Sequence, residues 1–549
     1  MEKTPSALIR RYEVLKSRRI RYEPFFRNVR DYVRPRKQGV DSSPINQGQR
    51  FDVNRFDSTA PDASRLLANA IQNALTPATE IWFGLQIPDG NPFAQFSDEG
   101  DVKRWFQDVE RKMFFTMHQS NFYSVIGETY LDYTSFHTMC IYSESNKDKQ
   151  GSLVYKSKSL GRFVFDEDIN GIADTVFEEY ELSARQAMQM FGKDDLPEKI
   201  SGKLEASPDT MFTFLRCVYP RKEYNEDKLD KKNMPYELRN IFLDDKEFIG
   251  EEGGYHEFPY AIGRFDKATG ENYGHGPSDI AMPPIKMLNC LKQLGLAQRA
   301  LEVHPPIFTR NKNIIGAYKW VPGALIPTID PKEVQQAKFS GNIQAEMMTV
   351  EGLVASIRKS YYADSLSLPE KSNMTATEIQ AIRQQTHTMM GPTISRFETE
   401  VLVPLILRTF GLMMRDNMFP PPPQSLHGLN QIDVKFIGQM ARAQLLHEVT
   451  STQQWLQTVI IPGMQADPSI LDIVDFDKIA SGSADRLGVP KDFIKDKAIV
   501  ERIRAERMQA KAKAEQQQEM MNLAEGAGKA APALGLLKES MSGQQPQAS

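Results

Sequence analysis

The chain has 549 residues, enough for roughly two to four domains and a large hydrophobic core. Its 67 basic and 71 acidic side chains nearly balance, which excludes a strongly basic nucleic-acid binder. The three cysteines lack CxxC spacing, which excludes a disulfide framework or a zinc knuckle and fits a reducing cytoplasm. No apolar run is long enough to span a membrane, and no apolar h-region follows the N-terminus, so we expect neither a membrane span nor secretion.

The N-terminal segment, residues 1–37, mixes basic and apolar side chains. Twelve Lys and Arg against four acids are interleaved with Leu8, Tyr12, Leu15, Phe26, Val29 and Tyr32. Such a mixture can bind nucleic acid, but the spacing favours an amphipathic helix whose arginines face solvent or a neighbouring subunit. A transit peptide has a similar basic composition, although the acids and Pro24 argue against one.

The next part of the chain changes from helical to strand-like patterns. Residues 59–75 have helix start and stop signals, Trp82 and Phe83 are predicted to be extended, and residues 101–142 are predicted to be helical. The apolar period then approaches two in runs at 152–165, 173–182, 211–219, 238–249 and 255–265, with a helix at 183–191. We therefore predict a mixed domain with an antiparallel sheet.

Two rod-like helices follow. The first, 285–303, lies between Pro283-Pro284 and Pro305-Pro306 and should be roughly 28 Å long. Residues 307–342 are rich in Pro and Gly and predict only short strands. The second helix, 343–361, repeats apolar residues at a spacing suited to packing on another helix: Ile343, Met347, Val350, Val354, Ile357 and Tyr361.

Residues 374–415 predict a long amphipathic helix, a pattern that in most proteins simply marks a core helix. Thr375 and Glu378 form a capping box, Pro392 and Pro404 should kink the helix, and the prolines at 420–423 should end it. Beyond it we predict a strand at 431–437, a helix at 441–460, an exposed helix at 491–523 and a disordered tail after residue 526.

A search for chemistry finds no active site. Asp166 to Gly171 matches the first half of a calcium-binding EF-hand loop, but the twelfth position is Phe177 and Asn170-Gly171 instead indicates a hairpin turn. Gly274-His275-Gly276 does not follow a clear strand and lacks a third glycine, so it does not predict dinucleotide binding. No phosphate-binding loop or metal-ligand spacing occurs. We therefore expect no enzymatic activity, cofactor or metal.

Five segments, in order, resemble the portal (head-to-tail connector) proteins of short-tailed, T7-like bacteriophages. They are residues 70–83 (AIQNALTPATEIWF), 168–176 (DINGIADTV), 255–265 (YHEFPYAIGRF), 273–289 (YGHGPSDIAMPPIKMLN) and 374–415. The resemblance covers roughly residues 8–420. It implies a mainly helical α+β fold with a wing, stem, clip and crown, assembled as a dodecameric ring around a DNA channel at one capsid vertex.

This resemblance assigns parts to the chain. They are a helical part of the wing (1–150), a β-rich part of the wing (151–275), a first stem helix (276–304), a clip (305–342), a second stem helix (343–365), a tunnel loop (366–374), a long kinked helix (375–423), a crown-like region (424–490) and a C-terminal helix with a flexible tail (491–549).

The resemblance also implies roles for particular residues. The tunnel loop would face DNA through Leu368, Pro369, Glu370, Lys371 and Ser372. The first stem helix would face the channel through Lys286, Asn289, Gln293 and Arg299. The second stem helix would pack between subunits through Met347, Val350, Val354 and Ile357. A nearly neutral chain suits a channel through which DNA slides, because each neutralised phosphate strengthens the grip on DNA.

The implied function is a portal through which DNA is packaged and ejected, with attachment first of terminase and then of the tail. Expected partners are further copies of the chain, the terminase large subunit, major capsid and scaffolding proteins, tail adaptor proteins and double-stranded DNA without sequence specificity, but no membrane. The expected location is the virion, and the host cytoplasm during assembly. The alternative is another head-tail adaptor or a scaffolding protein; adaptors are usually shorter, and scaffolds more polar and more helical.

Overall fold

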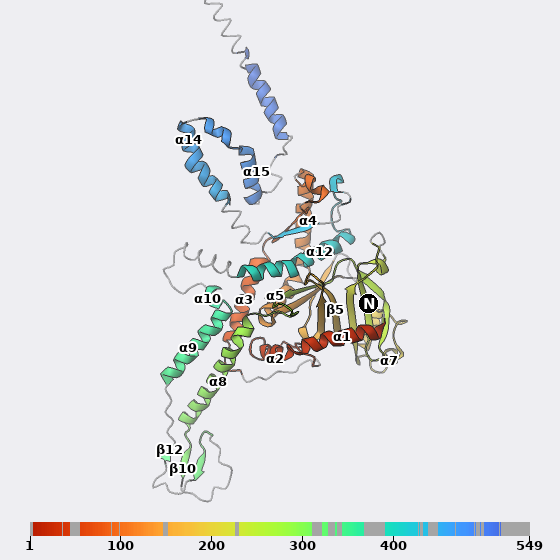
Figure 1. The fold of residues 1–549 in the computed structure, drawn as a ribbon, viewed down its shortest axis with the longest axis vertical. Coiled ribbons are helices and arrows are strands. Elements are labelled where there is room, and N and C mark those ends of the chain that lie inside the picture. The colour runs from red at the N-terminus through yellow and green to blue at the C-terminus, as the bar shows by residue number, and fades with distance from the viewer. Residues whose placement is uncertain are drawn as a thin grey trace, which may run out of the picture. The chain divides into compact units, whose positions relative to one another are not determined.

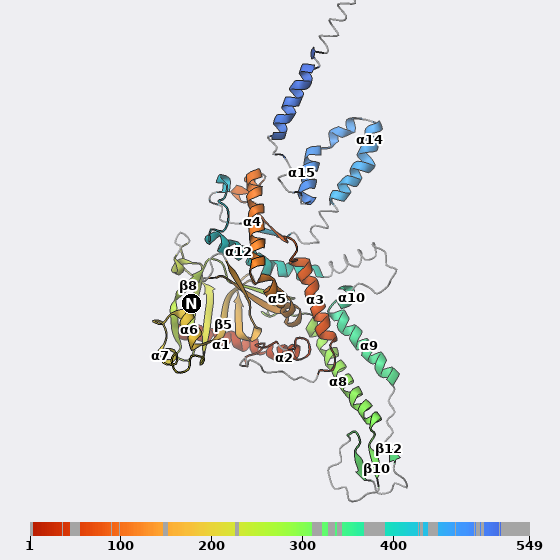
Figure 2. The same ribbon diagram turned by 180° about the vertical axis from the view of Figure 1, so that it is seen from behind.

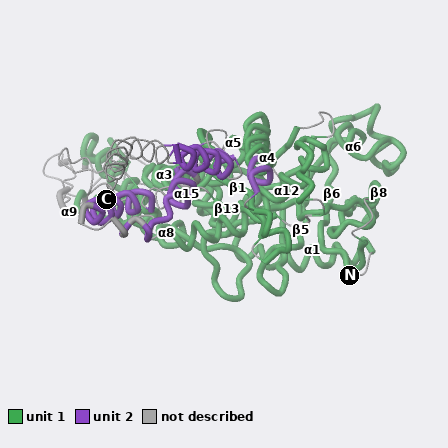
Figure 3. Tube along the Cα trace, turned by 90° about the horizontal axis from the view of Figure 1, so that it is seen from above, with its two compact units in different colours: residues 1–97, 105–441 green, residues 98–104, 442–549 purple. Residues whose placement is uncertain are grey.

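A computed structural model describes residues 4–35, 37–43, 55–88, 90–97, 99–146, 152–225, 230–309, 321–327, 335–336, 343–366, 390–426, 428, 432–436, 448–466, 468–487, 489, 495, 499–514 and 516–517. The chain divides into two compact units, residues 1–97 with 105–441 and residues 98–104 with 442–549 (Figure 3). Each unit is described by itself. Among the described residues, no helix combines the length and apolar character that a membrane span requires.

A five-stranded antiparallel sheet lies in the first unit (Figure 1). Its strands follow chain order: β4 (Phe163–Glu167), β5 (Ala173–Ser183), β6 (Met211–Pro220), β7 (Tyr236–Phe242) and β8 (Glu247–Tyr255). Because side chains alternate along β6, Leu215 packs on one face beneath helix α1 (Pro5–Ile20), and Phe214 packs on the other face beneath α6 (Ala184–Phe191) and α7 (Glu198–Ser201).

The amphipathic reading of the N-terminus is confirmed. Leu8, Tyr12 and Leu15 of α1 join the core of the sheet, and α2 (Glu23–Tyr32) buries Phe26 and Val29. Arg19 departs from the expectation that the arginines face solvent, because it is fully buried and donates a hydrogen bond to the Phe163 carbonyl over 3.0 Å.

A second, three-stranded sheet has the order β3-β2-β9, with β2 (Thr138–Ser145) between β3 (Leu153–Ser157) and β9 (Tyr260–Arg264). Helix α5 (Phe122–Phe136) packs on this sheet and on α3 (Thr59–Leu75). A two-stranded ribbon pairs β1 (Phe83–Gln86) with β13 (Asp433–Phe436), and α4 (Gly100–Gln119) precedes α5.

The predicted helix at 101–142 is confirmed as two helices up to Phe136 and is wrong for residues 137–142. Helices α4 and α5 occupy residues 100–136, and the chain then enters β2. The break is at His137, whose backbone is left-handed at φ 62°, so that the helix ends there. The strand run 238–249 is likewise two strands, joined by a turn in which Lys246 has φ 57°.

Two long helices lie side by side in the first unit, with a small sheet at their far end (Figures 1 and 2). Helix α8 is Pro277–Val303, α9 is Ile343–Ser360, and α10 (Ala363–Leu366) follows. The small sheet has the order β11-β10-β12, from β10 (Ile307–Thr309), β11 (Leu325–Pro327) and β12 (Gln335–Gln336). We call α8, this sheet and α9 the helical hairpin.

Helix α8 begins eight residues before the predicted start at Ile285. Pro283 and Pro284 lie inside the helix and remove two internal N–H donors, yet the helix continues. The prediction failed because prolines were taken as a boundary, whereas the start is at Pro277. Pro277 is in the first turn, where the missing N–H costs no helical hydrogen bond.

The long helix contains a π segment instead of a simple proline kink. Residues 390–397 are α-helical, Glu398–Leu402 form the π segment, and α12 (Val403–Arg415) follows. Pro404 comes two residues after this segment, and Pro462 in the second unit comes two residues after the π segment Leu456–Ile460. In each case the carbonyl four residues before the proline, which would clash with its ring, lies within the widened turn.

The prolines at 420–423 were predicted to end the long helix, but α12 already ends at Arg415. Asn417 is left-handed at φ 53°, and Met418 N–H donates to the Met413 carbonyl over 3.0 Å, a Schellman-type end. The predicted tunnel loop beyond Leu366 and the predicted cap at Thr375 and Glu378 lie outside the described residues.

The second unit is helical where it is described. Its elements are an α-helical stretch at 448–455, the π segment Leu456–Ile460, α14 (Ile461–Ala466), a 3-10 segment (Pro468–Ile473), α15 (Phe476–Leu487) and an exposed helix at 499–514. The short 3-10 segments of the first unit are Pro92–Phe96, Leu160–Arg162, Lys231–Asn233 and Gln424–Leu426.

Candidate functional site at the helical hairpin

The base of the helical hairpin is a buried polar junction. Ser278, in the first turn of α8, donates its hydroxyl hydrogen to the Ser135 carbonyl over 2.7 Å and lies 2.8 Å from the Tyr361 hydroxyl. Because the single Ser278 hydrogen is already used, the Tyr361 hydroxyl must donate to Ser278. The Ser278 backbone N–H donates to His137 Nε2 over 3.1 Å. The ends of α5, α8 and α9 are therefore joined at one point.

His137 is neutral at this junction. Burial, together with nearby His275, lowers the pKa of His137 to about 3. Because Nε2 accepts the Ser278 N–H, the ring hydrogen is on Nδ1. The junction therefore depends on an uncharged imidazole in a left-handed backbone position.

Two glycines allow the chain to pass His137. A Cβ at Gly274 would lie 2.1 Å from the His137 carbonyl oxygen, and one at Gly276 would lie 2.6 Å from His137 Nδ1. Any side chain at either position would collide with His137. The Gly274-His275-Gly276 motif is explained by this close packing.

A second anchor holds α8 about three turns farther along. Asn289 accepts the Phe56 N–H over 2.9 Å and donates to the Ile285 carbonyl over 2.9 Å. Lys292 forms an ion pair with Asp57. Burial acts to raise the pKa of Asp57, but hydrogen bonds from Lys292 and Thr59 lower it overall. The segment before α3 is therefore tied to α8.

Along its length the hairpin also exposes apolar side chains. Ile280, Met287 and Leu294 are seven residues apart, so that they share one face of α8, and they are 72%, 52% and 60% exposed. On α9, Met347 and Met348 are 56% and 74% exposed. The seven-residue spacing on α8 is visible in the sequence but was not used in the prediction.

The predicted stem residues differ in their exposure to solvent in the structure. Lys286, Gln293 and Arg299 are exposed on α8. Asn289 departs from the channel-facing expectation because it is 6% exposed and its amide bonds lie inside the subunit. On α9, Met347 is exposed and Val350 and Val354 are half-buried.

Ile357 also departs from the sequence-based expectation. It is fully buried within its own chain and therefore packs inside the subunit. The predicted tunnel-loop residues Leu368, Pro369, Glu370, Lys371 and Ser372 lie outside the described residues.

The long helix packs on strand β9 through residues that the sequence analysis did not single out. Buried Arg264 donates to Glu400 through Nη2 over 2.8 Å and through Nε over 3.2 Å. Gly263 gives room to the π segment, since a Cβ there would lie 2.5 Å from Val401 Cγ2. The sequence feature that could have indicated this contact is an arginine and a glycine within an apolar strand.

The hairpin reading of residues 166–171 is confirmed. Strands β4 and β5 are antiparallel, Gly171 has φ 78°, and the Asp168 carboxylate accepts the N–H groups of Asn170 and Ile172. Across the described part of the chain, no group of His, Cys, Asp or Glu side chains is arranged to hold a metal ion.

Comparisons with known proteins agree with this architecture. Residues 6–494 match the family described as bacteriophage head to tail connecting protein. The probable portal protein of Bordetella phage BPP-1 is 26% identical over 525 residues, which cover 92% of this chain and 91% of that protein. The portal protein of Salmonella phage epsilon15 is 25% identical over 541 residues, covering 96% and 94%. The resemblance to portal proteins is therefore confirmed, and the chain belongs to the bacteriophage head to tail connecting protein family.

Proposed function

We propose that the chain forms a closed ring of identical subunits at one capsid vertex, with a central channel for double-stranded DNA during packaging and ejection. The observation that carries the ring is the exposed stripe of Ile280, Met287 and Leu294 on α8, in a chain of the connector family. Three large apolar side chains on one helical face are unfavourable in water, and a second copy of the chain would cover them.

The arrangement of the hairpin suggests how neighbours meet. Helices α8 and α9 lie side by side, so that hairpins standing around a ring bring the outer face of α8 against α9 of the next subunit. Met347 and Met348, which are exposed apolar residues of α9, would receive the stripe. Methionine suits this role because its side chain adapts to its neighbours.

In this proposal helices α8 and α9 of the helical hairpin are the stem, and its small sheet is the clip. The two larger sheets and their helices would form the wing, residues 424–490 the crown, and residues 491–549 the C-terminal helix and tail. Lys286 and Gln293 would face the channel, and the tunnel-loop residues 368–372 would contact DNA. With a formal charge of −4, the chain would let DNA slide instead of gripping it.

The ring would bind the terminase large subunit during packaging and tail adaptor proteins afterwards, with major capsid and scaffolding proteins around it. It would assemble in the host cytoplasm and remain in the virion. The chain itself would catalyse no reaction, and the packaging energy would come from the terminase ATPase. The match to two portal proteins over more than nine-tenths of their length favours a portal over a shorter adaptor.

The test is the mass and shape of the purified protein. At micromolar concentration we expect closed rings with an axial hole in negative-stain images and by mass photometry. Met287→Glu should leave the circular dichroism spectrum of the folded chain unchanged and reduce ring formation at least tenfold, whereas Met287→Leu and the exposed Met190→Glu on α6 should assemble normally. A stable wild-type monomer would contradict the proposal.

Cys290 provides a second readout. It is exposed, whereas Cys140 and Cys217 are buried. Cys290 follows Met287 by three residues and precedes Leu294 by four, so it borders the stripe. A maleimide should therefore label Cys290 rapidly in unassembled Met287→Glu and at least tenfold more slowly in wild-type rings. Equal rates would show that the stripe stays uncovered.

A further inference from the structure

The outer face of helix α1 carries arginines that the subunit does not neutralise. Leu8, Tyr12 and Leu15 hold the buried face of this helix on the five-stranded sheet. Arg10 and Arg21 are eleven residues apart, about three helical turns, so both lie on the opposite side, where they are exposed. Among the described residues neither arginine forms an ion pair.

Arg18 lies beside this face and is only weakly paired. Its side chain is 58% exposed, and its ion pair with Asp166 is long, at 3.9 Å. Asp166 is already bound by Arg11 over 2.9 Å. Because a long, exposed ion pair contributes little, Arg18 remains available to a partner. We call Arg10, Arg18 and Arg21 the outer arginines of α1.

The segment that contains these arginines is basic, although the whole chain is slightly acidic. Residues 4–35 contain nine Lys and Arg and three acids, whereas the formal charge of the chain is −4. Charge of one sign gathered on one surface creates a local positive potential, which attracts a polyanion. The basic surface is therefore a local feature of α1 and its surroundings.

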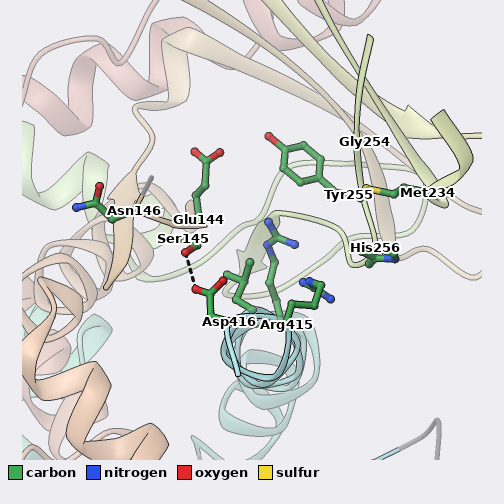
Figure 4. Close-up of a pocket in the computed structure, with 11 residues that line it drawn as sticks. Glu144, Ser145, Asn146, Met234, Gly254, Tyr255, His256, Arg415 and Asp416 are labelled. Carbon is green, nitrogen blue, oxygen red and sulfur yellow. Dashed lines mark hydrogen bonds between the residues drawn. The ribbon is translucent and has the colours of Figure 1, made fainter. Parts of the chain in front are cut away.

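Arginines elsewhere in the first unit are balanced by acids of their own subunit. A hollow of about 530 Å³ beside the end of α12 is lined by Arg408 and Arg415, but both donate hydrogen bonds to Glu257. Glu144 and Asp416 add two carboxylates to the same lining (Figure 4). This hollow repels a polyanion, in contrast to the outer face of α1.

The composition of the outer face of α1 favours nucleic acid over protein as the partner. Protein interfaces have an apolar or aromatic centre, whereas the turns between Arg10 and Arg21 place Val14 and Ser17 on this face. Interfaces with DNA are more polar and more positively charged. Duplex DNA carries one negative charge per roughly 1.7 Å of its axis, so several phosphates fit along the about 16 Å from Arg10 to Arg21.

We propose that the outer face of α1 binds the phosphate backbone of duplex DNA, without sequence specificity and outside the channel. The inference rests on the proposed function, because that function makes duplex DNA the polyanion that the ring meets. The channel is assigned to the helical hairpin, whereas α1 covers the five-stranded sheet. One such face on every subunit of a ring would add weak contacts into a stronger one.

Circular DNA separates this surface from the channel. A covalently closed duplex circle cannot thread a preformed closed ring, so its binding reports the outer surface. We expect wild-type rings to bind a fluorescent circle and Arg10→Gln/Arg18→Gln/Arg21→Gln to bind it at least tenfold more weakly. The slope of log affinity against log salt concentration should also fall by about 2 to 3, because each lost phosphate contact removes about 0.9.

A matched control removes the same charge from the other face of the same sheet. Arg185, Lys193 and Lys203 are exposed on and near α6 and α7, and residues 184–205 contain four Lys and Arg and four acids. Arg185→Gln/Lys193→Gln/Lys203→Gln should keep the affinity within twofold of the wild type. Equal losses in the two triple variants, or an unchanged salt slope for the α1 variant, would overturn the proposal.

A labelling experiment covers the case in which the α1 variant folds poorly. In a Cys290→Ser background, Ser17→Cys places a thiol between Arg10 and Arg21. Saturating DNA circle should slow its maleimide labelling at least fivefold, and should leave labelling of an exposed Ser207→Cys control unchanged. Equal rates with and without DNA at residue 17 would overturn the proposal.

Two further readings separate the alternatives. Labelled poly-L-glutamate represents an acidic protein partner, and the α1 variant should lose less affinity for it than for DNA; a larger loss would overturn the proposal. Mass photometry counts rings independently of DNA binding, and both triple variants should form them. Absence of rings in the wild type would contradict the proposed function, whereas wild-type rings that do not bind the circle would overturn this inference alone.

Discussion

Arg264 and Glu400 join strand β9 to the π segment of the long helix through a bidentate ion pair. The Arg264 guanidinium donates to both Glu400 oxygens, its backbone N–H also donates to Glu400 over 3.0 Å, and its side chain is 2% exposed. Nη2 additionally donates to the Gly171 carbonyl over 3.0 Å. Three of the segments that resemble portal proteins, 168–176, 255–265 and 374–415, therefore meet at one arginine.

Removing this arginine should destabilise the first unit strongly. Arg264→Met leaves the Glu400 carboxylate without its partner, which should lower the free energy of unfolding by about 3–5 kcal/mol. Adding Glu400→Met should recover part of that loss. The exposed pair of Arg396 and Asp266 is the control, and Arg396→Met should cost less than about 1 kcal/mol. Urea unfolding of the unassembled chain measures all three, and equal losses for the two arginines would contradict the prediction.

His137 should make stability fall as the pH is lowered. The folded-state pKa is about 3, below the ordinary value of 6.5, so the unfolded chain binds a proton first as the pH falls. Unfolding is then favoured by about 1.4 kcal/mol per pH unit between these two values.

His137→Gln removes this titration while keeping an acceptor near Ser278. The stability advantage of the wild type over His137→Gln should therefore be largest at pH 7.5 and shrink at pH 6.0 and 5.0. Unfolding curves at the three pH values measure it. A pH-independent difference would mean that His137 does not stay neutral in the fold.

Alanine substitutions at two glycines should change the stability of the protein in opposite directions. Gly274→Ala puts a Cβ 2.1 Å from the His137 carbonyl, and backbone atoms cannot move aside as a flexible side chain can, so it should destabilise by more than about 3 kcal/mol. Gly352 lies in α9 with nothing within 4 Å of an added Cβ, so Gly352→Ala should stabilise by about 0.5–1 kcal/mol. Thermal melts measure both changes, and a neutral Gly274→Ala would refute the close packing.

Local patterns predicted most elements of the first unit. Residues 59–75 form α3 as expected, and the strand runs at 173–182 and 211–219 became β5 and β6 with almost the same ends. The failure at 101–142 has a physical reason. Buried aromatic residues occupy both α5 and β2, so apolar character continues through the change of structure, and the left-handed residue that ends the helix is a histidine instead of a glycine.

Site residues were harder to predict because burial varies along one helix. The base of α8 is inside the unit, where Asn289 is buried, whereas farther along Leu296 is 53% exposed. A helical wheel separates faces but does not show where a helix leaves the body of the protein. The same limit explains Ile357, which lies at the buried end of α9. Contacts between distant segments, such as Arg264 with Glu400, have no signal in local spacing.

Glu110 should give a pH dependence of opposite sign to that of His137. This half-buried carboxylate on α4 accepts the Leu85 N–H of β1 over 2.7 Å. Burial raises its pKa to about 7, although the Leu85 hydrogen bond and Arg111 act to lower it. As the pH rises from about 4.5 to 7, the unfolded chain loses its proton first, so the wild type should lose up to about 3 kcal/mol of stability.

Glu110→Gln keeps an acceptor for Leu85 but does not titrate. Its stability relative to the wild type should therefore rise between pH 5 and 7 and level off above pH 7. Asp108→Asn is the control, because Asp108 is on the same helix and its side chain is 60% exposed, and its difference from the wild type should stay flat. Urea unfolding at pH 5, 6, 7 and 8 measures both variants. A Glu110→Gln difference that does not grow with pH would show that Glu110 is ionised in the fold already at pH 5.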